Sequence, residues 1–175
     1  MAGIQWLVPW NLMKKQTAIL RSGALYKFEM ASVDRQNPFR RAHMQLRILE
    51  KQVKLDSLGA FQPGEEVFVR LAVDESGFAV PEKLYRELPA EDGDFVNVIV
   101  QMINEKDTAA VLRYPFERYQ MSEKTARELR DALRENDLQH STSTDYVKVR
   151  IFSGQGLVEE VVIGGKSIEE LQAGR

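Results

Sequence analysis

Residue types that support catalysis are scarce in this chain of 175 residues. It has no cysteine, which excludes thiolate nucleophiles, disulfides and cysteine-ligated zinc. His43 and His140 are its two histidines, too few for a multi-histidine metal centre within one chain. No loop has the acidic spacing and glycine of an EF-hand calcium site. These residues favour a protein that is not an enzyme, and they predict no metal and no cofactor. Calcium or magnesium bound by carboxylates alone stays open as an alternative.

One group of residues with chemical potential lies at residues 34–43, DRQNPFRRAH. Asp34, Arg40 and His43 are close together here, and arginine offers paired donors to a carboxylate or a phosphate. A catalytic role for His43 requires a partner base or nucleophile that only the fold can bring near. Solvated loop charges are the simpler interpretation of the same pattern.

A second group is the aromatic corner at residues 114–119, YPFERY. Pro115 is expected to end a strand, and Phe116 to anchor the corner between this strand and the following helix. In a functional interpretation, Arg118 and Tyr119 line a recognition groove, because arginine and tyrosine often supply binding energy.

Two glycine-containing segments resemble catalytic motifs without matching them. Residues 164–167, GGKS, would need a glycine at position 160 to complete a phosphate-binding loop, and that position is Glu160. Residues 153–156, SGQG, lack the flanking pattern of a nucleophile elbow. Both are predicted to be turns.

The elements that must position these residues are mainly strands. Alternation of apolar and polar residues predicts strands on either side of a turn near Asn37–Pro38. The segment 95–103, FVNVIVQMI, is the strongest candidate for a central strand, and Pro81 restricts its segment to a sheet edge or an irregular stretch. The predicted strands cover residues 24–33, 43–55, 65–73, 78–88, 95–103, 108–114, 146–152 and 156–163.

One helix is predicted near residues 122–136, with Ser122 as its cap and a narrow apolar stripe of Ala126, Leu129, Ala132 and Leu133 that should lie on the sheet. The polar run 140–145 predicts a surface loop. The expected fold class is therefore α+β, predominantly antiparallel β as a sandwich or a barrel-like sheet, with this one helix. Residues 16–175 are predicted to form a single β-rich domain.

The apolar segment at residues 1–15 contains two tryptophans and ends with Lys14 and Lys15. Its apolar stretch is shorter than the roughly 20 residues that cross a bilayer. Three interpretations stay open: a segment that caps the domain, the end of a membrane anchor, or an interfacial segment. The net charge of −2 gives little attraction for nucleic acid, and no nucleic-acid partner is expected.

Four segments together resemble the GDYXXLXY family of uncharacterised bacterial proteins. They are QWLVPWNLM with AILRSGALYKF, then VDRQNPFRRAHMQLRI, YPFERYQMSEKTA and YVKVRIFSGQGLVEEVVIGGKSI. The name-giving motif is degenerate, because Asp34, Arg40 and Leu46 remain whereas Arg41, Ala42 and His43 replace its Gly-Asp-Tyr and Ile48 replaces its last tyrosine. The resemblance implies a protein anchored to a membrane at its N-terminus, which favours the anchor interpretation of residues 1–15.

Three functions follow as expectations. The first is a non-enzymatic accessory or interaction domain at a bacterial membrane, with a membrane protein as partner and the extracytoplasmic face preferred over the cytoplasmic one. Its contact residues would be Tyr114, Pro115, Phe116, Arg118 and Tyr119. The second is a domain that binds or hydrolyses a small ligand with the 34–43 loop over a pocket. The third is a structural oligomerisation module that pairs through its sheet edges.

Overall fold

The computed structural model describes residues 23–31, 39–40, 43–49, 51–90, 92–135 and 144–173. These residues form twelve strands and two helices, and every pair of neighbouring strands is antiparallel. The predicted class, a predominantly antiparallel fold, is confirmed. The apolar segment 1–15 and Asp34 lie outside the described residues. Within the described part, no helix is both long and apolar enough to cross a membrane.

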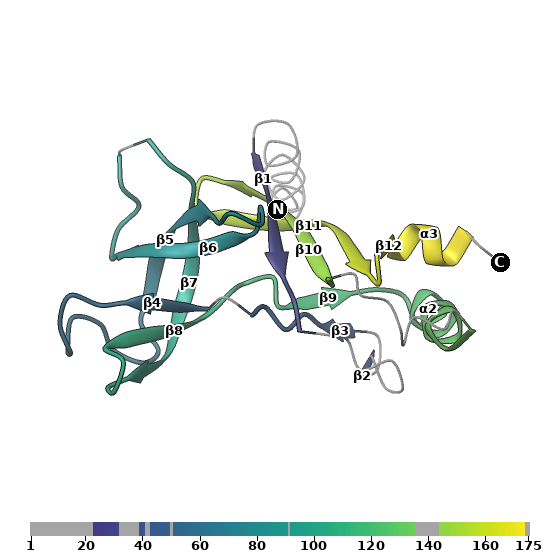
Figure 1. Cartoon of the computed structure of the whole chain (residues 1–175), viewed down its shortest axis with the longest axis horizontal. Coiled ribbons are helices and arrows are strands. Elements are labelled where there is room, and N and C mark those ends of the chain that lie inside the picture. The colour runs from purple at the N-terminus through teal and green to yellow at the C-terminus, as the bar shows by residue number, and fades with distance from the viewer. Residues whose placement is uncertain are drawn as a thin grey trace, which may run out of the picture.

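A five-stranded sheet forms one end of the molecule, on the left of Figure 1, with the order β4-β8-β7-β5-β6. Its strands are β4 (Gln52–Lys54), β5 (Glu66–Val73), β6 (Ala79–Tyr85), β7 (Phe95–Asn104) and β8 (Ala109–Arg113). The segment predicted as a central strand is β7, which pairs with β5 on one side and β8 on the other. This prediction is confirmed, as is the alternation in β5, where Val67, Val69 and Leu71 are buried.

The five-stranded sheet curls until its two edge strands, β4 and β6, approach each other. No ladder of backbone hydrogen bonds joins them among the described residues, so the barrel stays open along this seam. Pro81 lies in β6, where an absent N–H costs no ladder bond on the open side, and its predicted edge position is confirmed.

A four-stranded sheet with the order β1-β10-β11-β12 occupies the middle of the molecule (Figure 1). It consists of β1 (Ala24–Glu29), β10 (Tyr146–Phe152), β11 (Gln155–Ile163) and β12 (Lys166–Ser167). The predicted terminal hairpin is β10 and β11, and residues 164–165 form a turn into β12 with both glycines at positive φ. On the outer face, Lys148 pairs with Glu160, and Arg150 with Glu159 at 2.6 Å.

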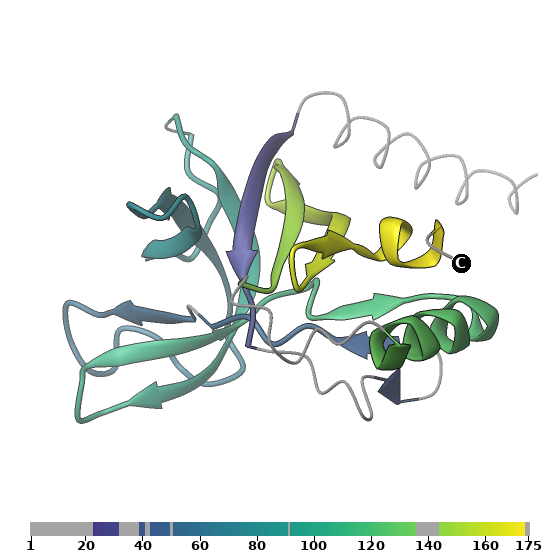
Figure 2. The same cartoon turned by 45° about the vertical axis from the view of Figure 1, so that its right-hand side comes forward.

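A three-stranded sheet, β2-β3-β9, lies at the other end beside the helices, as Figures 1 and 2 both show. It contains β2 (Phe39–Arg40), β3 (His43–Gln45) and β9 (Arg118–Gln120). The prediction of one strand over residues 43–55 is wrong. Its start is β3, its end is β4 in the five-stranded sheet, and Ile48 between them makes an isolated bridge to Met30.

The predicted helix is α2 (Glu123–Glu135), and Ser122 caps it by accepting a hydrogen bond from the Thr125 N–H at 3.0 Å. Ala126 is buried as expected, but the helix packs against a second helix, α3, rather than chiefly on the sheet. Figure 2 shows α2 and α3 close together.

The expectation of a single helix is therefore wrong, because α3 (Ile168–Ala173) was not predicted. A capping box fixes its start. The Ser167 hydroxyl accepts from the Glu170 N–H at 3.0 Å, and the Glu170 carboxylate accepts from the Ser167 N–H at 2.9 Å.

The predicted surface loop at residues 140–145 is wrong at its last residue, while residues 140–143 lie outside the described part. Asp145 is only 4% exposed. Its carboxylate accepts a hydrogen bond from the Gly164 N–H at 2.8 Å, and its carbonyl accepts from the Met30 N–H at 2.9 Å. These bonds to two separate segments explain why a polar side chain is buried here.

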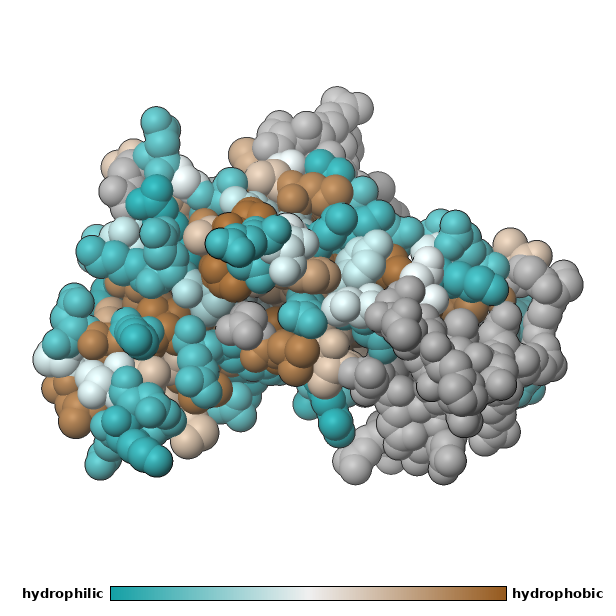
Figure 3. Space-filling view, viewed as in Figure 1, coloured by the Kyte–Doolittle hydropathy of each residue, from teal (hydrophilic) through white to brown (hydrophobic). Residues whose placement is uncertain are grey.

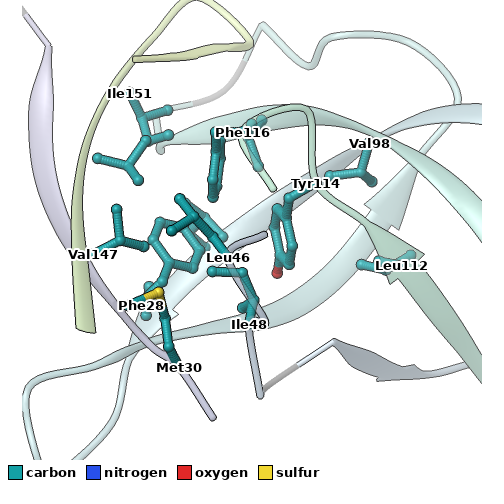
Figure 4. Close-up of a cluster of buried hydrophobic side chains, with 14 of the residues drawn as sticks. Phe28, Met30, Leu46, Ile48, Val98, Leu112, Tyr114, Phe116, Val147 and Ile151 are labelled. Atoms are coloured by element: carbon teal, nitrogen blue, oxygen red, sulfur yellow. The ribbon is translucent and has the colours of Figure 1, made fainter. Parts of the chain in front are cut away.

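The core is one cluster with residues from all three sheets. At its centre three aromatic rings pack together: the Phe28 ring lies 5.3 Å from that of Tyr114 and 4.9 Å from that of Phe116. The Tyr114 and Phe116 rings stack at 5.2 Å. Figure 4 shows Leu46, Ile48, Val147 and Ile151 around this trio. The trio thus joins β1 of the four-stranded sheet to the chain between β8 and β9.

Candidate functional site

The two segments that the sequence analysis singled out are neighbouring strands in space. β3, which contains His43, pairs with β9, which contains Arg118 and Tyr119. In their register His43 lies opposite Gln120, Met44 opposite Tyr119, and Gln45 opposite Arg118. The residues of the degenerate motif and the residues of the aromatic corner therefore belong to one small sheet.

The aromatic corner is built from residues that alternate between the core and the surface. Tyr114 and Phe116 are 2% and 3% exposed, whereas Pro115 and Arg118 are exposed and Tyr119 is half-buried. β8 ends at Arg113, before Pro115 as predicted, and Phe116 is buried at the turn. The prediction that this corner leads directly into the helix is wrong, because β9 lies between the corner and α2. Phe116 and Tyr114 contribute their rings to the core.

Glu117 holds the corner against two other segments. Its carboxylate accepts a hydrogen bond from the Lys51 ammonium at 2.6 Å and from the Tyr114 N–H at 3.1 Å. Its backbone carbonyl accepts from the Leu46 N–H at 2.8 Å. Both charged side chains are mostly buried, with 19% of Lys51 and 12% of Glu117 exposed, so the pair is poorly screened by solvent.

The outward side of the strand pair carries polar side chains. Gln45, Arg118 and Gln120 are exposed, and Pro115 is exposed beside them in sequence. We call these four residues the β3–β9 face. β9 is the last strand of its sheet, so in the described part of the chain no further strand pairs with its outer edge. The sequence analysis missed Gln45 and Gln120, because only the strand pairing places them beside Arg118.

Two residues of the degenerate motif, Leu46 and Ile48, lie in the core, whereas Arg40 and His43 are described by the pairing of their backbones. Leu46 is fully buried and Ile48 is 4% exposed, both against the aromatic trio. The backbones of Arg40 and His43 lie opposite each other in the pairing of β2 with β3. In this chain the motif thus supplies core residues and a strand entry.

A cavity of about 460 Å³ lies at the open seam of the five-stranded sheet. Its lining includes none of residues 34–43, so this cavity is not the pocket expected beneath the 34–43 loop. Among the described residues, no three histidine, aspartate or glutamate side chains are close enough together to hold a metal ion.

A side-chain hydrogen bond that no sequence pattern indicated joins β1 to the residue before β7, in addition to the backbone bond from the Asn97 N–H to the Gly154 carbonyl. The Tyr26 hydroxyl on β1 donates a hydrogen bond to the Asp94 carboxylate at 2.8 Å. Burial raises the pKa of Tyr26 to about 12, and the hydrogen bond to Asp94 and its negative charge act in the same direction. Tyr26 therefore stays protonated and keeps this contact over the whole physiological pH range.

The chain matches the profile of the GDYXXLXY protein family over residues 5–161. A search of the curated proteins and a search of the solved structures each found no match. The matched range includes all of the motif residues, the aromatic corner and the β10–β11 hairpin as far as Val161. The chain belongs to the GDYXXLXY family.

Proposed function

We propose that this protein is a non-enzymatic accessory domain at a bacterial membrane that contacts a membrane protein through the β3–β9 face. The observation that carries the proposal is the pairing of β3 with β9. It gathers Arg118, Gln45 and Gln120 on one exposed side, while Tyr119 and Met44 face the core.

The chemistry of this face suits recognition of another protein. Arginine and glutamine offer several hydrogen-bond donors, and arginine is enriched among residues that dominate binding energy. Arg118 makes no ion pair with another described residue, so a partner carboxylate meets no competitor among these residues. The outer edge of β9, which pairs with no other strand of the described chain, offers backbone N–H and C=O groups to an added strand.

The rigidity of the support favours the same role. Lys51, Glu117 and the buried rings of Tyr114 and Phe116 fix the chain immediately before β9. A surface held in place by core packing loses little conformational freedom on binding. The apolar segment with two tryptophans at residues 1–15 supports placement at the membrane.

The proposal is tested by site-specific photocrosslinking in cells of the source organism. A photoreactive residue replaces Gln120 in one protein and exposed Met102, on the five-stranded sheet, in another. We expect one membrane protein to be crosslinked from position 120 and not from position 102. Arg118→Ala should abolish this crosslink, whereas Arg113→Ala, at another exposed arginine on β8, should preserve it.

The outcomes separate the competing functions. A crosslink that persists in Arg118→Ala, or one formed equally from both positions, contradicts a role for the β3–β9 face. A crosslink from position 120 to a second copy of the same chain instead supports the oligomerisation module, and the mass of the purified protein in solution then checks it. Phe116→Ala is unsuitable as a probe, because that side chain lies in the core.

A further inference from the structure

The seam between β4 and β6 is a second candidate binding site in this fold, separate from the β3–β9 face. Both strands are sheet edges, and they approach without a backbone ladder in the described residues. The cavity of about 460 Å³ lies at this seam and is lined from both strands and from the chain between β4 and β5. Its volume falls within the range of about 300–1,000 Å³ that small-molecule sites occupy.

A β-bulge shapes one wall of the cavity. Arg70 lies opposite Lys83 and Leu71 opposite Pro81, which leaves Glu82 as the extra residue of β6. Bulges redirect side chains and are common at the rims of barrels beside binding sites. Here Glu82 and Lys83 both line the cavity, and Arg70 pairs with Glu82 at 3.4 Å.

The side chains that line the cavity carry a net positive charge. Three basic side chains line it, Lys54, Arg70 and Lys83, against the two carboxylates of Asp56 and Glu82. Arg70 balances Glu82. Lys54 and Lys83 have no ion-pair partner among the residues that the structure describes, and they stand on opposite sides of the seam.

An apolar surface lies between these charges. Leu84 is 7% exposed, and Leu55 and Phe61 are half-buried members of the lining that pack against the main core. Tyr85 forms a further part of the wall, and the Lys83 ammonium lies 5.6 Å from the centre of its ring. In the space-filling view, apolar residues show between hydrophilic ones over the five-stranded sheet (Figure 3).

We propose that the seam cavity binds a small organic anion that bridges Lys54 and Lys83 while its apolar part lies on Leu55, Leu84 and Phe61. The ligand class is a carboxylate or a phosphate monoester with a flat hydrocarbon group. The anion supplies the link between β4 and β6 that the backbone does not make. This site is independent of the β3–β9 face, since none of that face's residues line the cavity.

Ligand titrations followed by amide NMR spectra of the full chain test the site. The probes are phenyl phosphate and benzoate, with inorganic phosphate and phenol as partial ligands that carry only the charge or only the ring. We expect saturable shifts at the amides of β4, β6 and residues 60–61 with phenyl phosphate or benzoate, and weaker binding of the partial ligands. A preference for either anion then defines the headgroup.

The test variants are Lys54→Gln and Lys83→Gln, and the matched control is Lys106→Gln with Lys124→Gln, which removes the same charge from exposed positions outside the cavity. Each test substitution should weaken binding about threefold, and the pair about tenfold, because exposed ion pairs are individually weak. The control pair should leave the affinity unchanged.

Three results would overturn the site: no saturable shift with any probe at millimolar concentration, shifts that map outside the seam, or equal losses in the test and control pairs. Well-dispersed amide spectra of the unliganded variants show that each remains folded. Binding to the seam should also raise the thermal midpoint of the wild type and not that of the Lys54→Gln/Lys83→Gln variant.

Discussion

Three glycines separate the cost of steric overlap from the cost of backbone conformation. A Cβ at Gly156 would lie 2.7 Å from Cδ1 of Phe116, and the φ angle of this glycine is not positive. At Gly77 φ is +84° with no atom within 4 Å of the added Cβ. Gly154 combines both features, with φ at +79° and Cε1 of Phe68 at 2.7 Å. We substitute each by alanine.

The expected losses follow from these differences. Overpacking costs about 1–3 kcal/mol, and alanine restores about 0.5–1 kcal/mol by restricting the unfolded chain, so Gly156→Ala should lose about 0.5–2 kcal/mol. A left-handed conformation costs an L-residue about 1–2 kcal/mol, and with the same offset Gly77→Ala should lose about 1 kcal/mol. Gly154→Ala carries both penalties and should lose about 2–4 kcal/mol.

Urea unfolding followed by circular dichroism measures these free energies, provided that the denaturant slope stays constant. A double-mutant cycle identifies the atom responsible. Phe116→Leu removes the ring that meets Cβ at position 156, so Gly156→Ala/Phe116→Leu should lose at least about 0.5 kcal/mol less than the sum of the single variants. Gly77→Ala/Phe116→Leu should be additive. An additive result for Gly156, or a Gly156→Ala variant as stable as the wild type, would refute the steric argument.

Three further predictions concern polar contacts and the core. The pKa of Tyr26 is raised from 10.0 to about 12 in the folded state, so the associated stability is complete below pH 10 and is lost between about pH 10 and 12. In Tyr26→Phe, which cannot bond Asp94, the free energy of unfolding should fall less over this interval. Glu117→Gln should lose about 1.5–3 kcal/mol in urea unfolding, because the mostly buried Lys51 ammonium loses its anion. Ile48→Tyr, which restores the motif tyrosine, should lose about 1–3 kcal/mol in the same assay, because Ile48 is 4% exposed in a packed core. An unchanged stability would mean that the core has room for the ring.

Local patterns predicted the elements that are stabilised by local physics. The segment 95–103 is rich in β-branched residues, which is typical of a strand in the interior of a sheet. It forms β7, which has a partner strand on each side. Ser122 and the spacing of the apolar residues predicted α2 to within one residue at each end. The start of α3 was also predictable, since Ser167 and Glu170 have the spacing of a capping box, but a helix of six residues has no long periodic stripe.

Strand partners could not be predicted in the same way. Alternation over residues 43–55 shows which side chains face inward, yet it contains no information on which strand lies alongside. The chain uses β3 to pair with β9 and β4 to pair with β8, so one alternating segment serves two sheets. Burial of Asp145 and the hydrogen bond of Tyr26 to Asp94 likewise depend on segments far apart in the sequence.

Burial determines which residues of the corner and the motif are available for function. Tyr114 and Phe116 on one segment, and Leu46 and Ile48 on the other, point into a shared core. Arg118, which follows the turn at residues 115–116, and Gln45, which precedes Leu46, are exposed on paired strands. Truncation of an inward side chain changes stability, and through it every activity of the protein. Only the outward side chains can be changed without disturbing the core. If a partner binds the Arg113→Ala variant but not the Arg118→Ala variant, the loss of binding therefore reflects recognition and not folding.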